Sequence, residues 1–235
     1  MAGPGGVDVY IVELDRPEAE VATLGAILSG DERERMQRLR FERHRRRFVV
    51  CRATLREVLA SRLEIAPEAV RFSLGEHGKP YVKEGMPFNV AHSHELALIA
   101  VGEGAEAVGV DLELIRPNRA VEGLVGRYLS PVEREALGRL GGKELVVAFH
   151  WCWTAKEACL KAVGVGLSEP LDGFDVSVEL AAPPSLLADR GALGGGPWTL
   201  RRLDVGDGYA ATLALAAGEC RVFEHRLNAA GDFKV

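Results

Sequence analysis

This chain of 235 residues lacks the features that mark membrane proteins and disulfide-rich secreted proteins. No apolar run is long enough to cross a bilayer, and the first residues show no basic-then-apolar leader pattern. The four cysteines, Cys51, Cys152, Cys159 and Cys220, form no CxxC pair. We therefore expect reduced thiols in a core, a cytoplasmic location and no membrane partner.

The sequence also lacks the short motifs of several common enzyme classes. It has no GxxxxGK[ST] phosphate loop, no GxGxxG after a strand, no HExxH or Cys/His cluster, and no GxSxG elbow. These absences disfavour P-loop nucleotidases, dinucleotide-binding enzymes, zinc enzymes and serine hydrolases. The net charge of −5 argues against a nucleic-acid partner.

What the chain does have is a concentration of positive charge in an otherwise acidic protein. Ten arginines lie within one short stretch: Arg33, Arg35, Arg38, Arg40, Arg43, Arg45, Arg46, Arg47, Arg52 and Arg56. Because a guanidinium group forms two parallel charge-assisted bonds to phosphate, a basic phosphate-binding face is one interpretation. A solvated helix with Glu–Arg pairs from Glu32, Glu34 and Glu42 is the other, and this stretch alone does not decide between them.

The pattern of apolar residues predicts a mixed α and β chain. Strands are predicted at residues 7–14, 69–74, 88–91, 96–101, 108–115, 174–180, 198–203, 209–216 and 222–226. Helices are predicted over 31–63, as one long or two abutting helices, and over 143–163, ending at Gly164. Ser130, Pro131 and Glu133 have the signature of a capped helix start.

Two segments are predicted to be irregular. Residues 75–80 form a turn with two glycines and a proline, and residues 181–197 form a loop rich in Ala, Gly and Pro. The strand pair at 96–101 and 108–115 resembles a second pair at 209–216 and 222–226, which hints at an internal duplication.

Two carboxylates lie on one predicted strand, Gly109-Val110-Asp111-Leu112-Glu113. Side chains alternate along a strand, so Asp111 and Glu113 point the same way while Val110 and Leu112 point into apolar packing. Neighbouring carboxylates repel unless a cation lies between them, and Mg²⁺ prefers such oxygen ligands. From these five residues alone, a strand with one solvated polar face is the simpler interpretation.

The helix Trp151-Cys152-Trp153-Thr154-Ala155-Lys156-Glu157-Ala158-Cys159-Leu160-Lys161 places Glu157 and Lys161 on one face, four residues apart. A carboxylate among bulky apolar groups can be tuned as a base, and a lysine beside it can hold phosphate. The alternative is a surface Glu–Lys pair, which the tryptophan-rich flank makes less suitable.

Two further segments contain candidate anion-binding residues. His92 and Ser93 follow Asn89 at the end of a predicted strand, although a lone histidine satisfied in a turn is the simpler interpretation. Lys79 lies between Gly78 and Pro80 in a tight turn, where we expect its side chain to point outward as a phosphate ligand or an ordinary loop lysine.

Taken together and in order, these motifs resemble the Sfp-type 4′-phosphopantetheinyl transferases, over about residues 29–216. The matching pieces are Gly78-Lys79-Pro80, Phe88-Asn89-Val90-Ala91-His92-Ser93, Gly109-Val110-Asp111-Leu112-Glu113 and Trp153-Thr154-Ala155-Lys156-Glu157-Ala158-Cys159-Leu160-Lys161. Each piece is weak alone, whereas their order and spacing as a set are specific. One departure is Ala91, where family members often have serine, so a hydroxyl contact to coenzyme A is in doubt.

The resemblance implies an α+β fold with a pseudo-twofold arrangement of two similar α/β halves and an active site in the cleft between them. We place the halves at residues 1–115, with the basic helix and the first metal ligands, and 116–235, with the catalytic helix. A protein built as such a pseudo-dimer is expected to be a monomer.

The resemblance also implies the roles of individual residues. It implies that Asp111, Glu113 and Glu157 bind Mg²⁺, with Mn²⁺ as an alternative, and that Glu157 and Lys161 are catalytic. The residues expected to bind coenzyme A, the co-substrate, are Arg35, Arg47, Gly78, Lys79, Pro80, Asn89, His92, Ser93, Asp111 and Lys161.

The implied reaction is attack by a serine hydroxyl of an apo acyl or peptidyl carrier protein on the β-phosphorus of coenzyme A, releasing 3′,5′-ADP. Mg²⁺ and Lys161 would neutralise the pyrophosphate, and Glu157, directly or through a bound water, is the candidate base. A non-catalytic module that keeps the fold and another Mg²⁺-dependent phosphotransferase are the alternatives. The intact set of Asp111, Glu113, Glu157 and Lys161 argues against a module.

Overall fold

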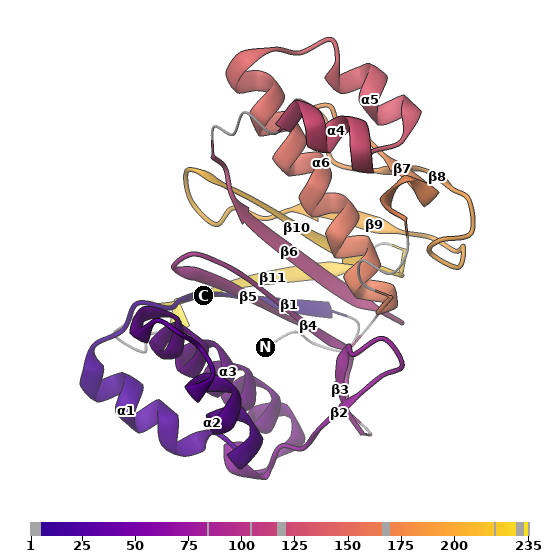
Figure 1. The fold of residues 1–235 in the computed structure, drawn as a ribbon. Helices are drawn as coiled ribbons and strands as arrows, with labels where there is room; N and C mark the ends of the chain where they lie inside the picture. The colour runs from indigo at the N-terminus through magenta and orange to yellow at the C-terminus, as the bar shows by residue number, and fades with distance from the viewer. Residues whose placement is uncertain are drawn as a thin grey trace.

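The computed structural model describes residues 6–83, 85–103, 105–116, 121–165, 170–218 and 220–228, together with the backbone of 233–234. Strands form the middle of the molecule, with helices α1–α3 on one side and α4–α6 on the other (Figure 1). The helices are α1 (Glu18–Ile27), α2 (Gly30–Gln37), α3 (Glu42–Leu63), α4 (Val121–Tyr128), α5 (Pro131–Leu137) and α6 (Gly142–Val163). The strands are β1 (Gly6–Glu13), β2 (Phe72–Leu74), β3 (Pro80–Val82), β4 (Phe88–Ser93), β5 (Leu96–Gly102), β6 (Val108–Leu114), β7 (Phe174–Val176), β8 (Leu186–Asp189), β9 (Thr199–Arg202), β10 (Tyr209–Leu215), β11 (Arg221–Leu227) and β12 (Phe233–Lys234).

Two sheets make up most of the strand layer. The larger has the order β12-β11-β1-β5-β4 and the smaller the order β6-β10-β9, while β2-β3 and β7-β8 are separate two-stranded ribbons. The last long strand, β11, runs parallel to β1, with Val7 opposite Val222, and β5 runs antiparallel on the other side of β1. The first and last parts of the chain therefore share one sheet.

The element order repeats along the chain, which confirms the α+β fold with two similar halves. One strand, a group of helices, a short ribbon and a strand pair occur first as β1, α1–α3, β2–β3, β4 and β5, and again as β6, α4–α6, β7–β8, β9 and β10. The long helices α3 and α6 both have 22 residues and both end at a left-handed residue, Glu64 and Gly164. The division predicted at residue 115 stays a prediction; by hydrogen bonding, β6 goes with the later strands.

The helix that contains Glu157 and Lys161 packs unusually close to its strand. A Cβ atom added at Gly109 of β6 would lie 2.0 Å from the carbonyl oxygen of Ala158 and 2.5 Å from the amide nitrogen of Ala162. Only a residue without a side chain fits between β6 and α6 at this separation. Gly109 therefore brings the carboxylates of β6 within reach of the charged face of α6.

Several local predictions are confirmed and others are wrong. The capping box at Ser130 and Glu133 and the end of α6 at Gly164 are as predicted, and the helical stretch 31–63 is two helices. The loop predicted at 181–197 contains β8, because Leu186–Asp189 pairs with β7. Helices α1 and α4 were not predicted from the sequence.

The environments of the cysteines are also defined. Cys51, Cys152 and Cys159 are buried and Cys220 is half-buried. Burial raises the pKa of the Cys51 thiol to about 11 and that of Cys159 to about 12, which disfavours the reactive thiolate. Among the described helices, none is both long and apolar enough to cross a membrane.

Candidate active site

The residues of β6 and α6 that were predicted to be functional lie close together. Lys161 donates a hydrogen bond from Nζ to Oδ1 of Asp111 at 2.5 Å, and Asp111 is only 4% exposed. Glu157, one helical turn before Lys161, is 8% exposed. A fully solvated face of β6 and an exposed Glu–Lys pair do not fit these positions, because Asp111 and Glu157 are buried and Lys161 and Glu113 are half-buried.

Glu113 lies at the edge of this group. It is half-buried, and its Oε2 accepts a hydrogen bond of 3.2 Å from the hydroxyl of Ser93. The Ser93 oxygen in turn accepts a bond of 3.1 Å from the amide of Leu114. Ser93 thus fixes the direction of Glu113 from the neighbouring strand β4.

The pKa values of all three carboxyl groups are raised. Burial, followed by the charge of Asp111, raises the pKa of Glu157 to about 7, against the opposing effect of Lys161. Burial also raises the pKa of Asp111, and burial together with the charge of Asp111 raises that of Glu113. The site therefore holds more negative charge than Lys161 alone compensates.

These residues fit a divalent cation. Oδ2 of Asp111 and Oε1 of Glu157 are buried and have no hydrogen-bond partner among the described residues. Unpaired buried carboxylate oxygens are the donors that Mg²⁺ takes. Within the described part of the chain, no three His, Cys, Asp or Glu side chains are grouped closely enough to hold a metal ion by themselves. A cation here would need further oxygen ligands, such as water or phosphate.

Asn89 and Ser93 join the two sheets across the site. Asn89 is buried, and its Oδ1 accepts a bond of 2.9 Å from the amide of Val110. The hydroxyl oxygen of Ser93, four residues later on β4, accepts a similar bond from the amide of Leu114. These two side chains, which were predicted to contact coenzyme A, hold β4 of the first half against β6 of the second.

His92 lies between them on the opposite face of β4, and it is surrounded by positive charge. Its side chain is exposed, and its pKa is lowered by loss of hydration and then by the charges of Lys161, Arg35 and His44. Arg35 and His92, both predicted to bind phosphate, therefore lie close enough for the charge of Arg35 to affect His92. His44 joins them, which the sequence did not indicate.

The other arginines are largely engaged in the fold. Arg52 and Arg56 both donate to Glu32, at 2.6–2.9 Å and 2.7 Å. Arg47, a predicted ligand of coenzyme A, donates two bonds to Asp15, at 2.6 and 2.7 Å. The Glu–Arg pairs expected from Glu32, Glu34 and Glu42 are therefore present, whereas phosphate binding by the remaining arginines stays a prediction.

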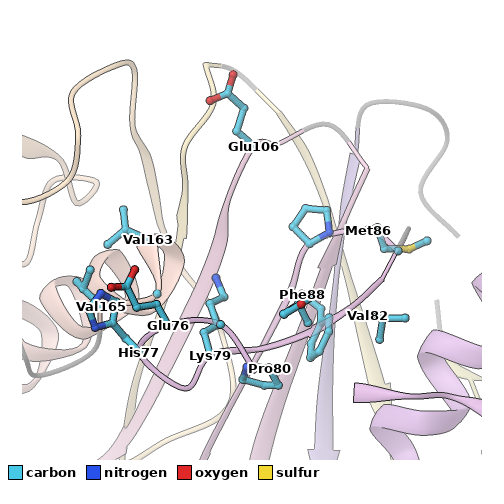
Figure 2. Close-up of a pocket in the computed structure, with 15 residues that line it drawn as sticks. Glu76, His77, Lys79, Pro80, Val82, Met86, Phe88, Glu106, Val163 and Val165 are labelled. Carbon is cyan, nitrogen blue, oxygen red and sulfur yellow. The ribbon is translucent and has the colours of Figure 1, made fainter. Parts of the chain in front are cut away.

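A cavity of about 660 Å³ lies beside the turn of residues 75–80. In Figure 2, Val163 and Val165 from the end of α6 lie on one side, Val82, Met86 and Phe88 on the other, and Lys79 and Pro80 between them. A left-handed Gly78, with φ of 82°, closes the turn. The lining of the cavity is about equally polar and apolar, and its walls come from both halves of the chain.

The expectation that Lys79 points outward is wrong. Its Nζ donates to the carbonyl oxygens of Val108, at 3.1 Å, and Ala162, at 2.7 Å. Burial lowers the pKa of Lys79 to about 8. The tight turn at Gly78 suggested an exposed lysine, but the turn packs against α6 and directs this side chain inward.

Sequence reasoning missed a buried lysine that supports α6, the helix of Glu157 and Lys161. Lys156, next to Glu157, is fully buried and donates to Oε1 of Glu133 at 2.5 Å and to the carbonyl of Phe174 at 2.6 Å. Glu133 also accepts from the amides of Ser130 and Val176. The available signal was a lysine within an otherwise apolar helix face.

Comparison with known proteins gives consistent matches over both halves. A family model described as the 4′-phosphopantetheinyl transferase superfamily matches residues 107–214, and one described as 4′-phosphopantetheinyl transferase, N-terminal, matches residues 16–103. The 4′-phosphopantetheinyl transferase HetI of Nostoc sp. is 35% identical over 215 residues, covering 89% of this chain and 87% of HetI. The 4′-phosphopantetheinyl transferase Sfp of Bacillus subtilis is 28% identical, covering 72% of this chain and 75% of Sfp.

Among solved structures, a holo-(acyl-carrier-protein) synthase from Bacillus anthracis in complex with coenzyme A is 24% identical with a TM-score of 0.40. The match covers 48% of this chain and 98% of that protein.

Proposed function

Because the chain belongs to the 4′-phosphopantetheinyl transferase superfamily, we propose that it transfers the phosphopantetheine arm of coenzyme A to a serine hydroxyl of an apo carrier protein. The alternatives of a binding module or another phosphotransferase have no observation in their favour. Two observations support transfer most directly. Lys161 donates a hydrogen bond to the buried Asp111. One carboxylate oxygen of Asp111 and one of Glu157 have no partner among the described residues and could bind a cation.

Asp111, Glu113 and Glu157 would hold Mg²⁺, or Mn²⁺ in its place. The ion would neutralise charge on the pyrophosphate of coenzyme A and so stabilise the transition state for its cleavage. Lys161, which donates a hydrogen bond to Asp111, would bind the same pyrophosphate. The excess negative charge among the carboxylates supports this assignment.

The remaining parts of coenzyme A have matching surfaces. His92 and Arg35 would contact the nucleotide phosphates, since the positive charges of Lys161, Arg35 and His44 all act at His92. The nucleoside would border the cavity beside the turn at Gly78, which Lys79 and Pro80 line. Asn89 and Ser93 would shape this surface through their hydrogen bonds to backbone amides of β6. Arg47, which Asp15 holds in place through two hydrogen bonds, would add positive charge to it.

In the proposed reaction, the serine oxygen forms a bond to the β-phosphorus while the bond from that phosphorus to the bridging oxygen breaks. The leaving group is 3′,5′-ADP, and the serine proton passes to Glu157. Glu157 would take this proton directly or through a bound water. Lys161 offsets the negative charge that develops on the leaving phosphate.

The acceptor would be an acyl or peptidyl carrier protein of fatty acid, polyketide or nonribosomal peptide synthesis. Free arginines beside the site would attract an acidic partner at long range. We further propose that the protein acts in the cytoplasm as a monomer, since one chain supplies both halves of the site.

The test is to incubate the protein with coenzyme A, Mg²⁺ and a panel of apo carrier proteins, followed by intact mass analysis. We expect one phosphopantetheine arm to be added to at least one carrier. Asp111→Asn should slow the transfer about a hundredfold or more, because one ligand of the charge-neutralising group is lost. Glu144→Gln, an exposed change in the first turn of α6, is the matched control. No mass gain on any carrier, or normal activity of Asp111→Asn, would refute the proposal.

A further inference from the structure

The ammonium group of Lys79 lies in an unusual position for a residue of a surface turn. The turn belongs to the first half of the chain, whereas both of its acceptors, the carbonyl oxygens of Val108 and Ala162, belong to the second. No carboxylate among the described residues lies within ion-pair distance of it. Lys79 therefore joins the two halves through backbone carbonyls rather than through an opposite charge.

One of those carbonyls is at the end of the catalytic helix. The last carbonyl groups of a helix have no partner within the helix and carry partial negative charge, so a cation placed there stabilises the final turn. In α6 the amide of Gly164 closes the turn on Leu160, and Nζ of Lys79 satisfies Ala162 at 2.7 Å. Lys79 thus acts as a cap for α6 that comes from the opposite half.

The stem of Lys79 packs on the same helix end. A Cβ atom added at Gly164 would lie 3.1 Å from Cδ of Lys79. Gly164 also has a φ of 86°, which favours glycine for a second reason. The side chain is therefore held along its length, by packing at the stem and by hydrogen bonds at the tip.

This cap lies directly beside catalytic groups. Ala162 directly follows Lys161 in the sequence. Glu157 lies one helical turn before Lys161, on the same face of α6 as Lys161. The other side of the same helix end, at Val163 and Val165, forms a wall of the cavity next to Pro80. One contact therefore sets both the wall of the cavity and the direction of Lys161.

We infer that Lys79 is a positioning residue, which fastens the last turn of α6 to the turn of residues 75–80 and so aligns Lys161 with Asp111, rather than a ligand of phosphate. The kinetic part of its test rests on the proposed transferase function, whereas the exchange part does not.

Hydrogen exchange on the ligand-free protein separates this role from phosphate binding. Lys79→Met keeps the stem and removes the ammonium group, so amides of residues 158–165 should exchange about tenfold faster, as expected for loss of a charge-assisted hydrogen bond. Lys79→Arg keeps the charge and should retain most of the protection. Lys83→Met, an exposed lysine on the same hairpin, is the matched control and should change nothing. Unchanged exchange in Lys79→Met would overturn the inference.

Steady-state kinetics give the second readout. Misalignment of Lys161 should lower kcat of Lys79→Met about tenfold, with KM for the carrier protein unchanged and with Lys79→Arg restoring most of the rate. A rise in KM for coenzyme A with normal kcat would identify Lys79 as a phosphate ligand instead. A lower unfolding midpoint with normal kcat and KM would identify a purely structural contact. Either result refutes the positioning role. If wild-type protein shows no transfer, the proposed function fails, while the exchange experiment still decides whether Lys79 fastens the last turn of α6.

Discussion

Replacing Glu157 by glutamine should make the protein more stable at neutral pH while removing its activity. Glu157 is buried, and its pKa is raised from an ordinary value of 4.5 to about 7 by burial and by the nearby carboxylates. Each pKa unit corresponds to about 1.4 kcal/mol, so holding the ionised group costs the folded state about 3 kcal/mol above pH 7. Glutamine has nearly the same shape and carries no charge.

The dependence on pH has a definite sign. Below pH 4.5 the carboxyl group is protonated in both folded and unfolded protein, and it contributes no pH dependence. Between pH 4.5 and about 7 the folded protein keeps a proton that the unfolded protein has released, so wild-type stability falls as pH rises. The stability advantage of Glu157→Gln should therefore grow with pH in this window, by about 2.5 kcal/mol between pH 5 and pH 8.

Urea denaturation of both proteins at pH 5 and pH 8, with a chelator present, measures this change in the free energy of unfolding. The exposed Glu144→Gln on the same helix should show no such dependence on pH. Adding Mg²⁺ should narrow the gap, because a cation among the carboxylates would stabilise wild-type protein. A gap that is the same at both pH values, or wild-type protein that is the more stable at pH 8, would refute this account of Glu157.

Three further outcomes follow from contacts elsewhere in the structure. Gly109→Ala should destabilise the protein by roughly 3 kcal/mol or more in urea denaturation, because the new methyl group would overlap the backbone at Ala158; a loss below 1 kcal/mol would mean that α6 can move away at little cost. Lys156→Met should cost about 3–5 kcal/mol, because it leaves the Glu133 carboxylate buried without its partner, and wild-type stability would show that Glu133 is satisfied by its amide donors alone. Arg43→Glu, an exposed charge reversal in the first turn of α3, should raise KM for the carrier protein about fivefold at low salt and leave KM for coenzyme A unchanged; equal effects on both would place Arg43 in the nucleotide site.

The local patterns were sufficient to predict most elements that contain site residues. The alternation at 108–115 and the glycine after residue 163 predicted β6 and α6 with nearly correct ends. The paired carboxylates and the Glu–Lys face were also visible in the sequence. Their convergence was not, because the contact between Asp111 and Lys161 depends on the close packing that Gly109 permits.

The roles of Lys79, Asn89 and Arg47 could not be predicted for a related reason. Each was expected, from the family resemblance, to bind coenzyme A, and each has a partner in the fold that is distant in sequence: Ala162, Val110 and Asp15. A lysine or arginine that satisfies backbone or carboxylate oxygens looks the same in sequence as one that awaits a ligand. Only the three-dimensional position distinguishes the two.

The pairing of β11 with β1 has a consequence for how the protein is made. Strand β1 begins at Gly6 but its parallel neighbour β11 begins only at Arg221, so β1 leaves the ribosome long before its partner is made. Until then one edge of β1 presents unpaired backbone groups, which invite association with other chains. Completion of the larger sheet must therefore wait for the synthesis of β11, and a stall or truncation before residue 221 would leave a nascent protein with an open, aggregation-prone edge.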